Sequence, residues 1–162
     1  MRELDPATSE AHATILRLQS AYADVISRRA WDELGDLFTD EAVVRIDVRN
    51  PERPPFDLVG PAAMGEFLSG ALDAFAFFEF SILTTVVDVA PGAAHATGRV
   101  YLCELRCDHA GAWSQAFGLY QDRYARSEDG DWRIAGRHYA SLARLAAAPG
   151  THVDTFPFPD LA

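Results

Sequence analysis

The sequence has 162 residues, of which 49% are hydrophobic, enough to form one domain with a sizeable buried core. Its 14 Lys and Arg residues against 24 Asp and Glu residues give a formal charge of −10, and no basic cluster interrupts this acidity. Such a surface repels phosphate backbones and anionic lipid, so we expect neither nucleic acid nor a membrane as a partner.

The first part of the chain is predicted to form three helices and one strand. Apolar residues recur at helical spacing over about residues 7–29, and a shorter helical pattern follows over residues 31–38. A β-branched strand is predicted near residues 42–48, followed by a proline-rich loop. A third helix is predicted to start at Gly60 and Pro61, because proline at the first helical position gives up only an N–H that has no partner there.

The second part of the chain changes to a strand-like pattern. Turns that contain glycine separate four long strands, which are predicted near residues 76–89, 94–108, 113–127 and 131–143. Three consecutive hairpins imply an antiparallel sheet, and helices followed by such a meander indicate the α+β class. Long strands coil, so we expect the N-terminal helices to pack on a strongly curved sheet that encloses a pocket. Residues 1–145 are predicted to form this pocket domain. Residues 146–162 are predicted to be an irregular tail that closes the pocket, packs on a partner chain or stays disordered.

The two cysteines are predicted to be free thiols. Cys103 and Cys107 lie on one predicted strand, about 13 Å apart at ~3.3 Å per residue, which exceeds the reach of a disulfide. The sequence has no zinc-ligand spacing, so we expect no metal. A charged N-terminus without an apolar signal stretch, and no apolar run near the roughly 20 residues of a membrane span, favour a cytoplasmic protein.

Five local segments occur in a recognisable order over most of residues 15–140. They are YADVISRRAWDELGDLF (22–38), VRIDVRN (44–50), LVGPAAMGEFL (58–68), ELRCDH (104–109) and DRYARSEDGDWRIAG (122–136). In this order they resemble the nuclear transport factor two-like superfamily, especially scytalone dehydratase and the SnoaL-like cyclases. The resemblance implies a cone-shaped α+β barrel, often dimeric, whose pocket transfers protons without a metal or bound coenzyme. Members of the superfamily dehydrate, isomerise, cyclise or only bind.

Glu79 and His109 are the residues predicted to move protons. His109 precedes a turn, where the resemblance places one of the two catalytic histidines of scytalone dehydratase, and a histidine exchanges protons near neutral pH. The alternative for His109 is a solvated residue beside a turn. Glu79 lies among phenylalanines, at or beside the position of the second histidine. Because side chains alternate along a strand, Glu79 faces either the pocket or the outer surface.

Tyr22 and Asp122 are predicted to stabilise an oxyanion. The resemblance to the ketosteroid isomerase branch matches Tyr22 on the first helix and Asp122 on a strand to an oxyanion hole. There, a phenol and a neutral carboxylic acid both donate hydrogen bonds. The alternatives are a Tyr22 that only fills the core and an Asp122 that makes an outward ion pair with Arg123 or Arg137.

Six further residues are predicted to bind the substrate, namely Tyr120, His138, Ser27, Trp132, Phe78 and Tyr101. The resemblance places Ser27 at the position of the helical acid of scytalone dehydratase, so the dehydration of that enzyme cannot be copied to this chain. By alternation His138 shares the face of Trp132, and a histidine on an apolar face is more often a core residue than a catalyst. If the register shifts by one residue, Arg137 and Tyr139 replace His138.

The leading functional hypothesis is a cofactor-independent lyase or cyclase. It would dehydrate, isomerise or close a ring by acid–base catalysis on a small, largely apolar carbonyl or polyketide-like metabolite of bacterial-type secondary metabolism. An epoxide-opening hydrolase or cyclase in the same pocket is one alternative. A non-catalytic, ligand-binding homodimer is the other, and it predicts that Glu79 and His109 point outward or away from each other. The catalytic scheme fails if either side chain lies on the convex face of the sheet.

Overall fold

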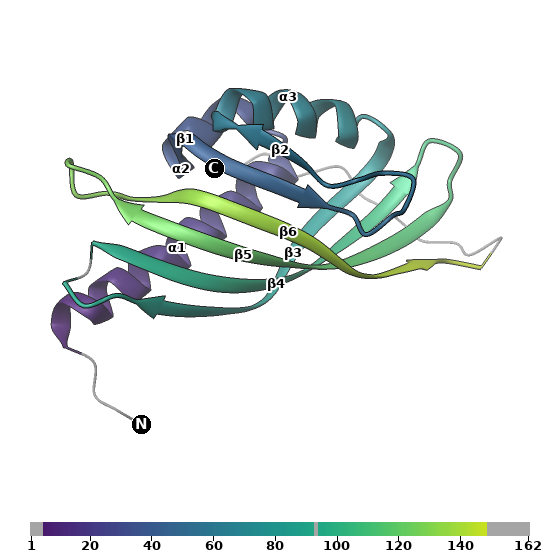
Figure 1. The fold of residues 1–162 in the computed structure, drawn as a ribbon. Coiled ribbons are helices and arrows are strands. Elements are labelled where there is room, and N and C mark those ends of the chain that lie inside the picture. Colours follow the sequence, from purple (N-terminus) through teal and green to yellow (C-terminus); the bar gives the residue numbers. More distant parts are fainter. Residues whose placement is uncertain (1–4, 93, 149–162) are drawn as a thin grey trace, which may run out of the picture.

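The structure is a computed structural model that describes residues 5–92 and 94–148. Helices cover one face of a six-stranded sheet, and the strands curl around them without closing into a barrel (Figure 1). The helical elements are α1 (Pro6–Arg28), the 3-10 turn η1 (Trp31–Glu33), α2 (Leu34–Leu37) and α3 (Gly60–Leu72). The strands are β1 (Phe38–Asp47), β2 (Phe56–Val59), β3 (Phe75–Val89), β4 (His95–Asp108), β5 (Trp113–Arg126) and β6 (Trp132–Ala146).

The sheet is mixed, with the strand order β2-β1-β6-β5-β4-β3. The three long hairpins from β3 to β6 and the α+β class confirm the prediction from sequence. β1 pairs in parallel with β6, and β2 pairs antiparallel with β1 at the sheet edge. The sequence pattern did not predict β2, because four residues after a proline-rich loop are too few to show alternation. Phe38 begins β1 instead of ending the second helix.

Helix α1 is defined at both ends by local chemistry. Its first residue is a proline, and the Asp5 side chain caps the helix by accepting from the Thr8 N–H at 3.1 Å. Arg29 ends it in the left-handed conformation, with φ of 59°. The apolar stripe predicted from the sequence is buried and consists of Ile15, Leu18, Tyr22, Val25 and Ile26. Among the described residues, no helix is long and apolar enough to be a membrane span.

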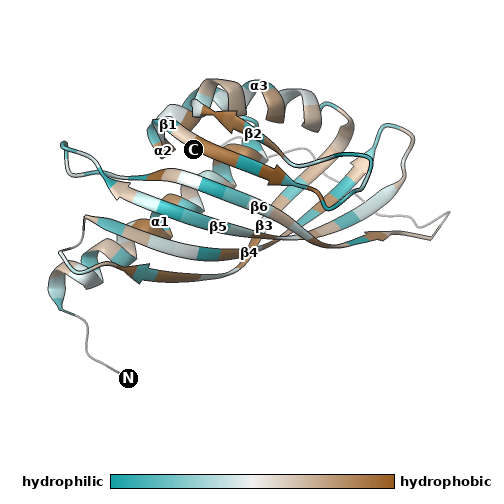
Figure 2. Ribbon diagram, viewed as in Figure 1, coloured by the Kyte–Doolittle hydropathy of each residue, from teal (hydrophilic) through white to brown (hydrophobic). Residues whose placement is uncertain are grey.

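One face of the sheet is buried against the helices, and its residues alternate with those of the outer face. Figure 2 shows hydrophobic and hydrophilic stretches following one another along the strands. On β4, Val100 and Leu102 are fully buried, and on β3 Phe80 is 4% exposed. The same parity therefore places residues 104 and 106 of β4 on the inner face and residue 79 of β3 on the outer face.

A β-bulge in β6 inverts which of its residues face inward. Tyr124 pairs with Ile134, whereas Arg123 pairs with Gly136, so the strand carries an extra residue between these two pairs. Ile134 is buried before the bulge, and Arg137 and Tyr139 are buried after it. The register-shifted alternative is therefore the observed one, and His138 lies on the outer face.

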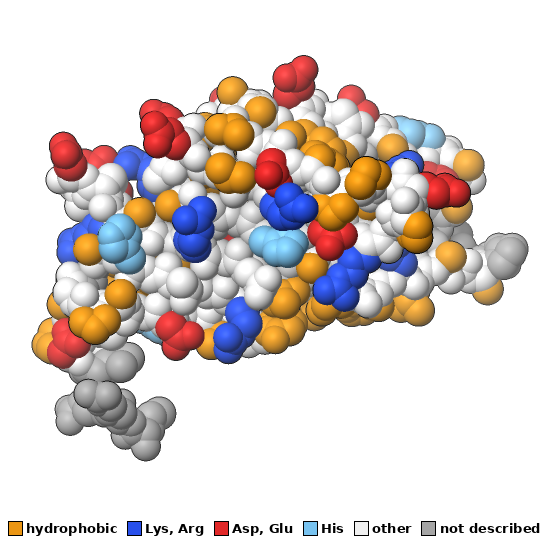
Figure 3. Space-filling view, viewed as in Figure 1, with side chains coloured by type: hydrophobic (Ala, Val, Ile, Leu, Met, Phe, Trp, Pro, Cys, Tyr) orange, Lys and Arg blue, Asp and Glu red, His pale blue; other side chains and the backbone are white. Residues whose placement is uncertain are grey.

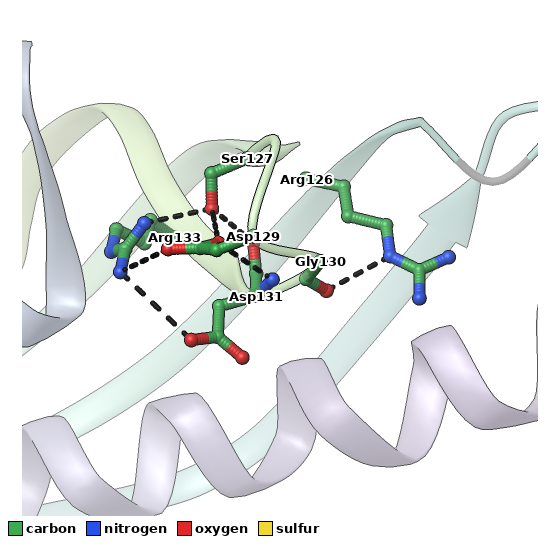
Figure 4. Close-up of polar contacts among 6 residues, drawn as sticks. All are labelled: Arg126, Ser127, Asp129, Gly130, Asp131 and Arg133. Carbon is green, nitrogen blue, oxygen red and sulfur yellow. Dashed lines mark hydrogen bonds and ion pairs between the residues drawn. The ribbon is translucent and has the colours of Figure 1, made fainter.

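Polar contacts close the turn between β5 and β6 (Figure 4). The Ser127 N–H donates to the Asp131 carbonyl at 2.8 Å, and Gly130 takes a φ of 92° that favours glycine. The Ser127 hydroxyl and then the Asp131 N–H donate to the Asp129 carboxylate and, with a smaller contribution from Arg133, lower its pKa to about 2. These polar side chains hydrogen-bond to one another and to the turn backbone, so their role is to stabilise the turn.

Candidate active site

A cavity of about 160 Å³ lies between α1, α3 and the inner face of the sheet. Its polar lining consists of Glu104 and Arg106 of β4 and three tyrosines, Tyr22, Tyr120 and Tyr139. Its apolar lining consists of Ile26, Ile46, Val48, Phe67, Leu68, Ala71, Leu72, Phe75, Phe78 and Phe80. An apolar cavity of about 150 Å³ accepts benzene, so this one has room for a molecule built around a single ring.

Glu104 is the acidic residue of this cavity. Its side chain is 17% exposed, and its carboxylate lies 3.5 Å from Nη1 of Arg106. Within residues 5–92 and 94–148 the carboxylate accepts no hydrogen bond. Burial raises the pKa of Glu104, and the positive charges of Arg106 and Arg144 offset this only in part. A carboxyl group in such surroundings can exchange a proton closer to neutral pH than an ordinary one.

Arg106 has hydrogen-bonding capacity that the described protein atoms leave unused. Its side chain is 18% exposed, and its Nε is buried without a hydrogen-bond partner. The guanidinium carbon lies 5.4 Å from the centre of the Phe75 ring. The cation is therefore held against an aromatic wall while N–H groups stay available for a ligand.

Tyr22 and Tyr120 form a pair of hydroxyl donors in the cavity. Their oxygens are 3.3 Å apart, so one hydroxyl donates to the other and one O–H remains. Burial raises the pKa of both phenols, and also that of Tyr139, so all three keep their protons at neutral pH. The Arg137 guanidinium packs against the rings of the pair, 4.3 Å from the centre of Tyr22 and 3.9 Å from that of Tyr120.

Asp122 and Arg137 form a second ion pair, in which both side chains are fully buried. Arg137 donates to the two carboxylate oxygens of Asp122 at 2.8 and 2.7 Å. Gln19 of α1 and the Tyr124 hydroxyl each add a hydrogen bond of 2.9 Å to the carboxylate. Asp122 therefore makes the predicted ion pair with Arg137, but inward, and its carboxylate oxygens are already occupied by hydrogen bonds from protein groups.

Some of the predicted site residues line the cavity and others lie elsewhere in the molecule. Tyr22, Tyr120 and Phe78 line the cavity. Trp132 is 6% exposed, in the core at the start of β6, and is not part of the lining. Ser27 is half-buried on α1 and is not part of the lining either.

Glu79 and His109 are not brought together, which corrects their predicted placement. Glu79 is exposed on the outer face because its neighbours Phe78 and Phe80 take the inner one. His109 is exposed in the turn between β4 and β5, where its Nε2 lies 2.9 Å from the Asp73 carbonyl oxygen. The scheme in which these two residues exchange protons in one pocket therefore fails.

Tyr101 and His138 also lie on the outer face of the sheet, which corrects their placement in the pocket. Tyr101 alternates with inward residues of β4, and His138 follows the β6 bulge. A shallow depression of about 510 Å³ hollows this face, and its charged side chains include Arg45, Asp88, Arg99, Arg123 and His138. Figure 3 views the outer face, where arginine and histidine side chains stand among acidic ones. Unlike the inner cavity, the depression has no aromatic walls that exclude water.

Sequence reasoning missed Glu104 and Arg106, although the ELRCDH segment contains both. The signal that could have revealed them is the alternation of side chains along the strand. Every second residue faces the same way, so Glu104 and Arg106 share a face with the apolar Val100 and Leu102. Two opposite charges on an otherwise apolar face indicate a polar site in the interior. In the described part of the chain, both cysteines are free and no group of three or more His, Cys, Asp or Glu residues could hold a metal ion.

Comparisons with known proteins place this fold. The model of the SnoaL-like domain family matches residues 7–138. The hexachlorocyclohexane dehydrochlorinase LinA-type3 of Novosphingobium barchaimii is 14% identical, with a TM-score of 0.80 over 94% of this chain and 100% of that one. A protein assigned as scytalone dehydratase from Novosphingobium aromaticivorans is 17% identical, with a TM-score of 0.71 over 91% and 98% of the two chains. ActVI-ORFA of Streptomyces coelicolor is 17% identical, with a TM-score of 0.64 over 80% and 96%. At these identities the likeness establishes the fold alone, and no curated protein matches the sequence.

Proposed function

The chain belongs to the SnoaL-like domain family, and we propose that its inner cavity catalyses a metal-free lyase, isomerase or cyclase reaction on a ring-sized carbonyl compound. The observation that carries this proposal is the environment of Glu104. Its carboxylate stands in an aromatic-walled cavity with a raised pKa, and no hydrogen bond from the described residues occupies it. Enzymes use carboxylates tuned in this way as acids and bases.

In the proposed reaction Glu104 removes a proton from the carbon next to the substrate carbonyl. The electron pair of the broken C–H bond moves into the carbonyl group, and negative charge develops on its oxygen. Tyr22 and Tyr120 share one hydrogen bond, which uses the O–H of one of them. The O–H of the other donates to this oxygen. The Glu104 carboxylic acid then returns the proton, either to another carbon in an isomerisation or to a β-hydroxyl that leaves as water in a dehydration.

The finer parts of the proposal concern the substrate and its setting. We propose a small, largely apolar carbonyl or polyketide-like metabolite of bacterial-type secondary metabolism, handled in the cytoplasm by a homodimer. The volume of about 160 Å³ and the apolar lining support a small substrate of this kind.

A non-catalytic ligand-binding module is the second candidate function. The outward positions of Glu79 and His109 are what this candidate predicts. The desolvated Glu104 favours the enzyme, because burying a carboxylate beside a ligand cavity costs stability that a pure binding site for an apolar molecule need not lose.

A proton-exchange assay tests the proposal without knowledge of the natural substrate. The probe is cyclohexanone in D₂O, and NMR measures deuterium uptake at its α carbons. We expect the wild-type protein to accelerate uptake above buffer and Glu104→Gln to lower the enzymatic rate by about 10² to 10⁴-fold. The matched control is Glu79→Gln, the same change on the opposite face of the sheet, which should leave the rate unchanged. No acceleration by the wild type, or full activity in Glu104→Gln, would overturn the proposal in favour of the binding module.

A further inference from the structure

The charges around the inner cavity do not balance. Glu104 and Arg106 line it as one negative and one positive group. A second cation, the exposed Arg144, opposes the rise that burial causes in the pKa values of Glu104 and Tyr139. Its guanidinium donates to the carbonyl of Val48, which is itself a lining residue. One guanidinium in the lining and one exposed guanidinium beside it therefore stand against one carboxylate, in a chain whose formal charge is −10.

Arg106 also lacks the partners that a largely buried guanidinium normally has. It has five N–H donors in a planar fork, and within residues 5–92 and 94–148 its ion-pair contact is the 3.5 Å approach to Glu104. Its Nε has no hydrogen-bond partner among the described residues. Leaving a buried donor unpaired is costly, and a carboxylate with two oxygens is the acceptor that best matches a guanidinium fork.

We infer that the cavity selects a ring-sized organic monoanion, whose carboxylate is held by Arg106 in the field of Arg144. When Glu104 is ionised, the charges of Glu104, Arg106 and Arg144 sum to one positive charge, which the ligand would neutralise. The aromatic rings of Phe75 and Phe78, whose centres are 6.1 Å apart, supply apolar surface for the ring of the ligand. This inference rests on the proposed function for its reaction, but it concerns recognition and is measured by binding.

Calorimetric titration with benzoate and with uncharged benzamide, which has nearly the same shape, tests this selectivity. We expect the wild-type protein to bind benzoate at least about tenfold more tightly than benzamide. Arg106→Gln should weaken benzoate binding by about tenfold or more and leave benzamide unchanged. Arg99→Gln is the matched control, because it makes the same change on the outer face of β4, and it should alter neither affinity. Glu104→Gln should tighten benzoate binding, because it removes a like charge from the cavity.

Equal wild-type affinities for benzoate and benzamide would overturn the inference, and this comparison needs no variant to fold. Unchanged benzoate binding in Arg106→Gln would also overturn it. The outcome is separable from that of the enzymatic proposal, because cyclohexanone exchange involves no anionic ligand. Exchange that depends on Glu104 without charge selectivity would refute only the recognition of a monoanion. Charge selectivity without exchange would refute only the catalytic proposal.

Discussion

Two carboxylate–arginine pairs lie on the inner face of the same sheet, and they differ in how fully their hydrogen bonds are used. Asp122 and Arg137 are 2.7 Å apart and fully buried, and Gln19 and Tyr124 complete the carboxylate's partners. Glu104 and Arg106 are 3.5 Å apart beside the cavity, and Nε of Arg106 has no partner among the described residues. Each guanidinium keeps one buried nitrogen without a partner among the described residues, Nη1 in Arg137 and Nε in Arg106, so the contrast lies in the carboxylates. The Asp122 carboxylate accepts four hydrogen bonds, whereas the Glu104 carboxylate accepts none from the described residues and has capacity left for a ligand.

We infer from this difference that hydrogen-bond geometry, and not residue type, distinguishes a structural ion pair from one that is available to a ligand. A buried pair is tolerated when hydrogen bonds satisfy both partners, because these offset the loss of hydration. The Asp122 carboxylate meets this condition, although Nη1 of Arg137 is buried without a hydrogen-bond partner among the described residues. The pair links α1 to β5 and β6 through Gln19. The pair formed by Glu104 and Arg106 does not meet it, and its carboxyl keeps a raised pKa.

The largest expected effect is on the stability that depends on the fully buried pair of Asp122 and Arg137. Asp122→Asn should lower the free energy of unfolding by about 3–5 kcal/mol, because it leaves Arg137 as an uncompensated buried charge. Arg106→Gln, which alters the looser pair, should lower it by less, about 1–3 kcal/mol, because Glu104 can take up a proton when its partner is removed. Urea denaturation of the two variants measures both values. Equal losses would contradict the division into a structural and a reactive pair.

The next effect concerns the hydroxyl pair in front of Arg137. Tyr120→Phe should lower the rate of cyclohexanone exchange by about 10²-fold, because it removes a donor to the developing oxyanion. Tyr101→Phe makes the same change on the outer face of the sheet and should have no effect. If the two variants were equally active, the tyrosine pair would have no part in the reaction.

The smallest effect is a stability gain from Glu104→Gln at neutral pH. The folded-state pKa of Glu104 is raised above its ordinary value, so the native state holds this proton more tightly than the unfolded state does. Wild-type stability therefore falls as the pH rises from the unfolded to the folded pKa of this group. Glu104→Gln should remove that loss and raise the Tm at neutral pH by about 2–4 °C, with no gain at a pH below the ordinary glutamate pKa. A Tm difference that does not change with pH would speak against the raised pKa.

Much of the fold was predictable from periodicity. The long helical stripe of α1, the proline at the start of α3 and the glycine turns between β3 and β6 are local signals, and each was placed close to its observed bounds. The parallel pairing of β1 with β6 joins segments that are distant in the sequence, so no local pattern contained it.

The candidate site was predictable only in part, because alternation defines two strand faces without saying which one is buried. Glu79 and Glu104 lie on neighbouring strands, and the inward positions of Phe78 and Phe80 decide between the two carboxylates. The bulge in β6 adds one residue, which a two-residue period cannot anticipate, and it turns His138 outward.

The central claim is that Glu104 is a base tuned by burial, and the pH dependence of kcat/KM for cyclohexanone exchange tests it most directly. Over about pH 4 to about 8 we expect a sigmoidal rise whose midpoint lies above the ordinary glutamate pKa of about 4.3, because the carboxylate is the active form. This rise should be absent in Glu104→Gln and retained in Glu79→Gln. A midpoint at or below the ordinary value, or the same rise in Glu104→Gln, would contradict the assignment of Glu104 as the base.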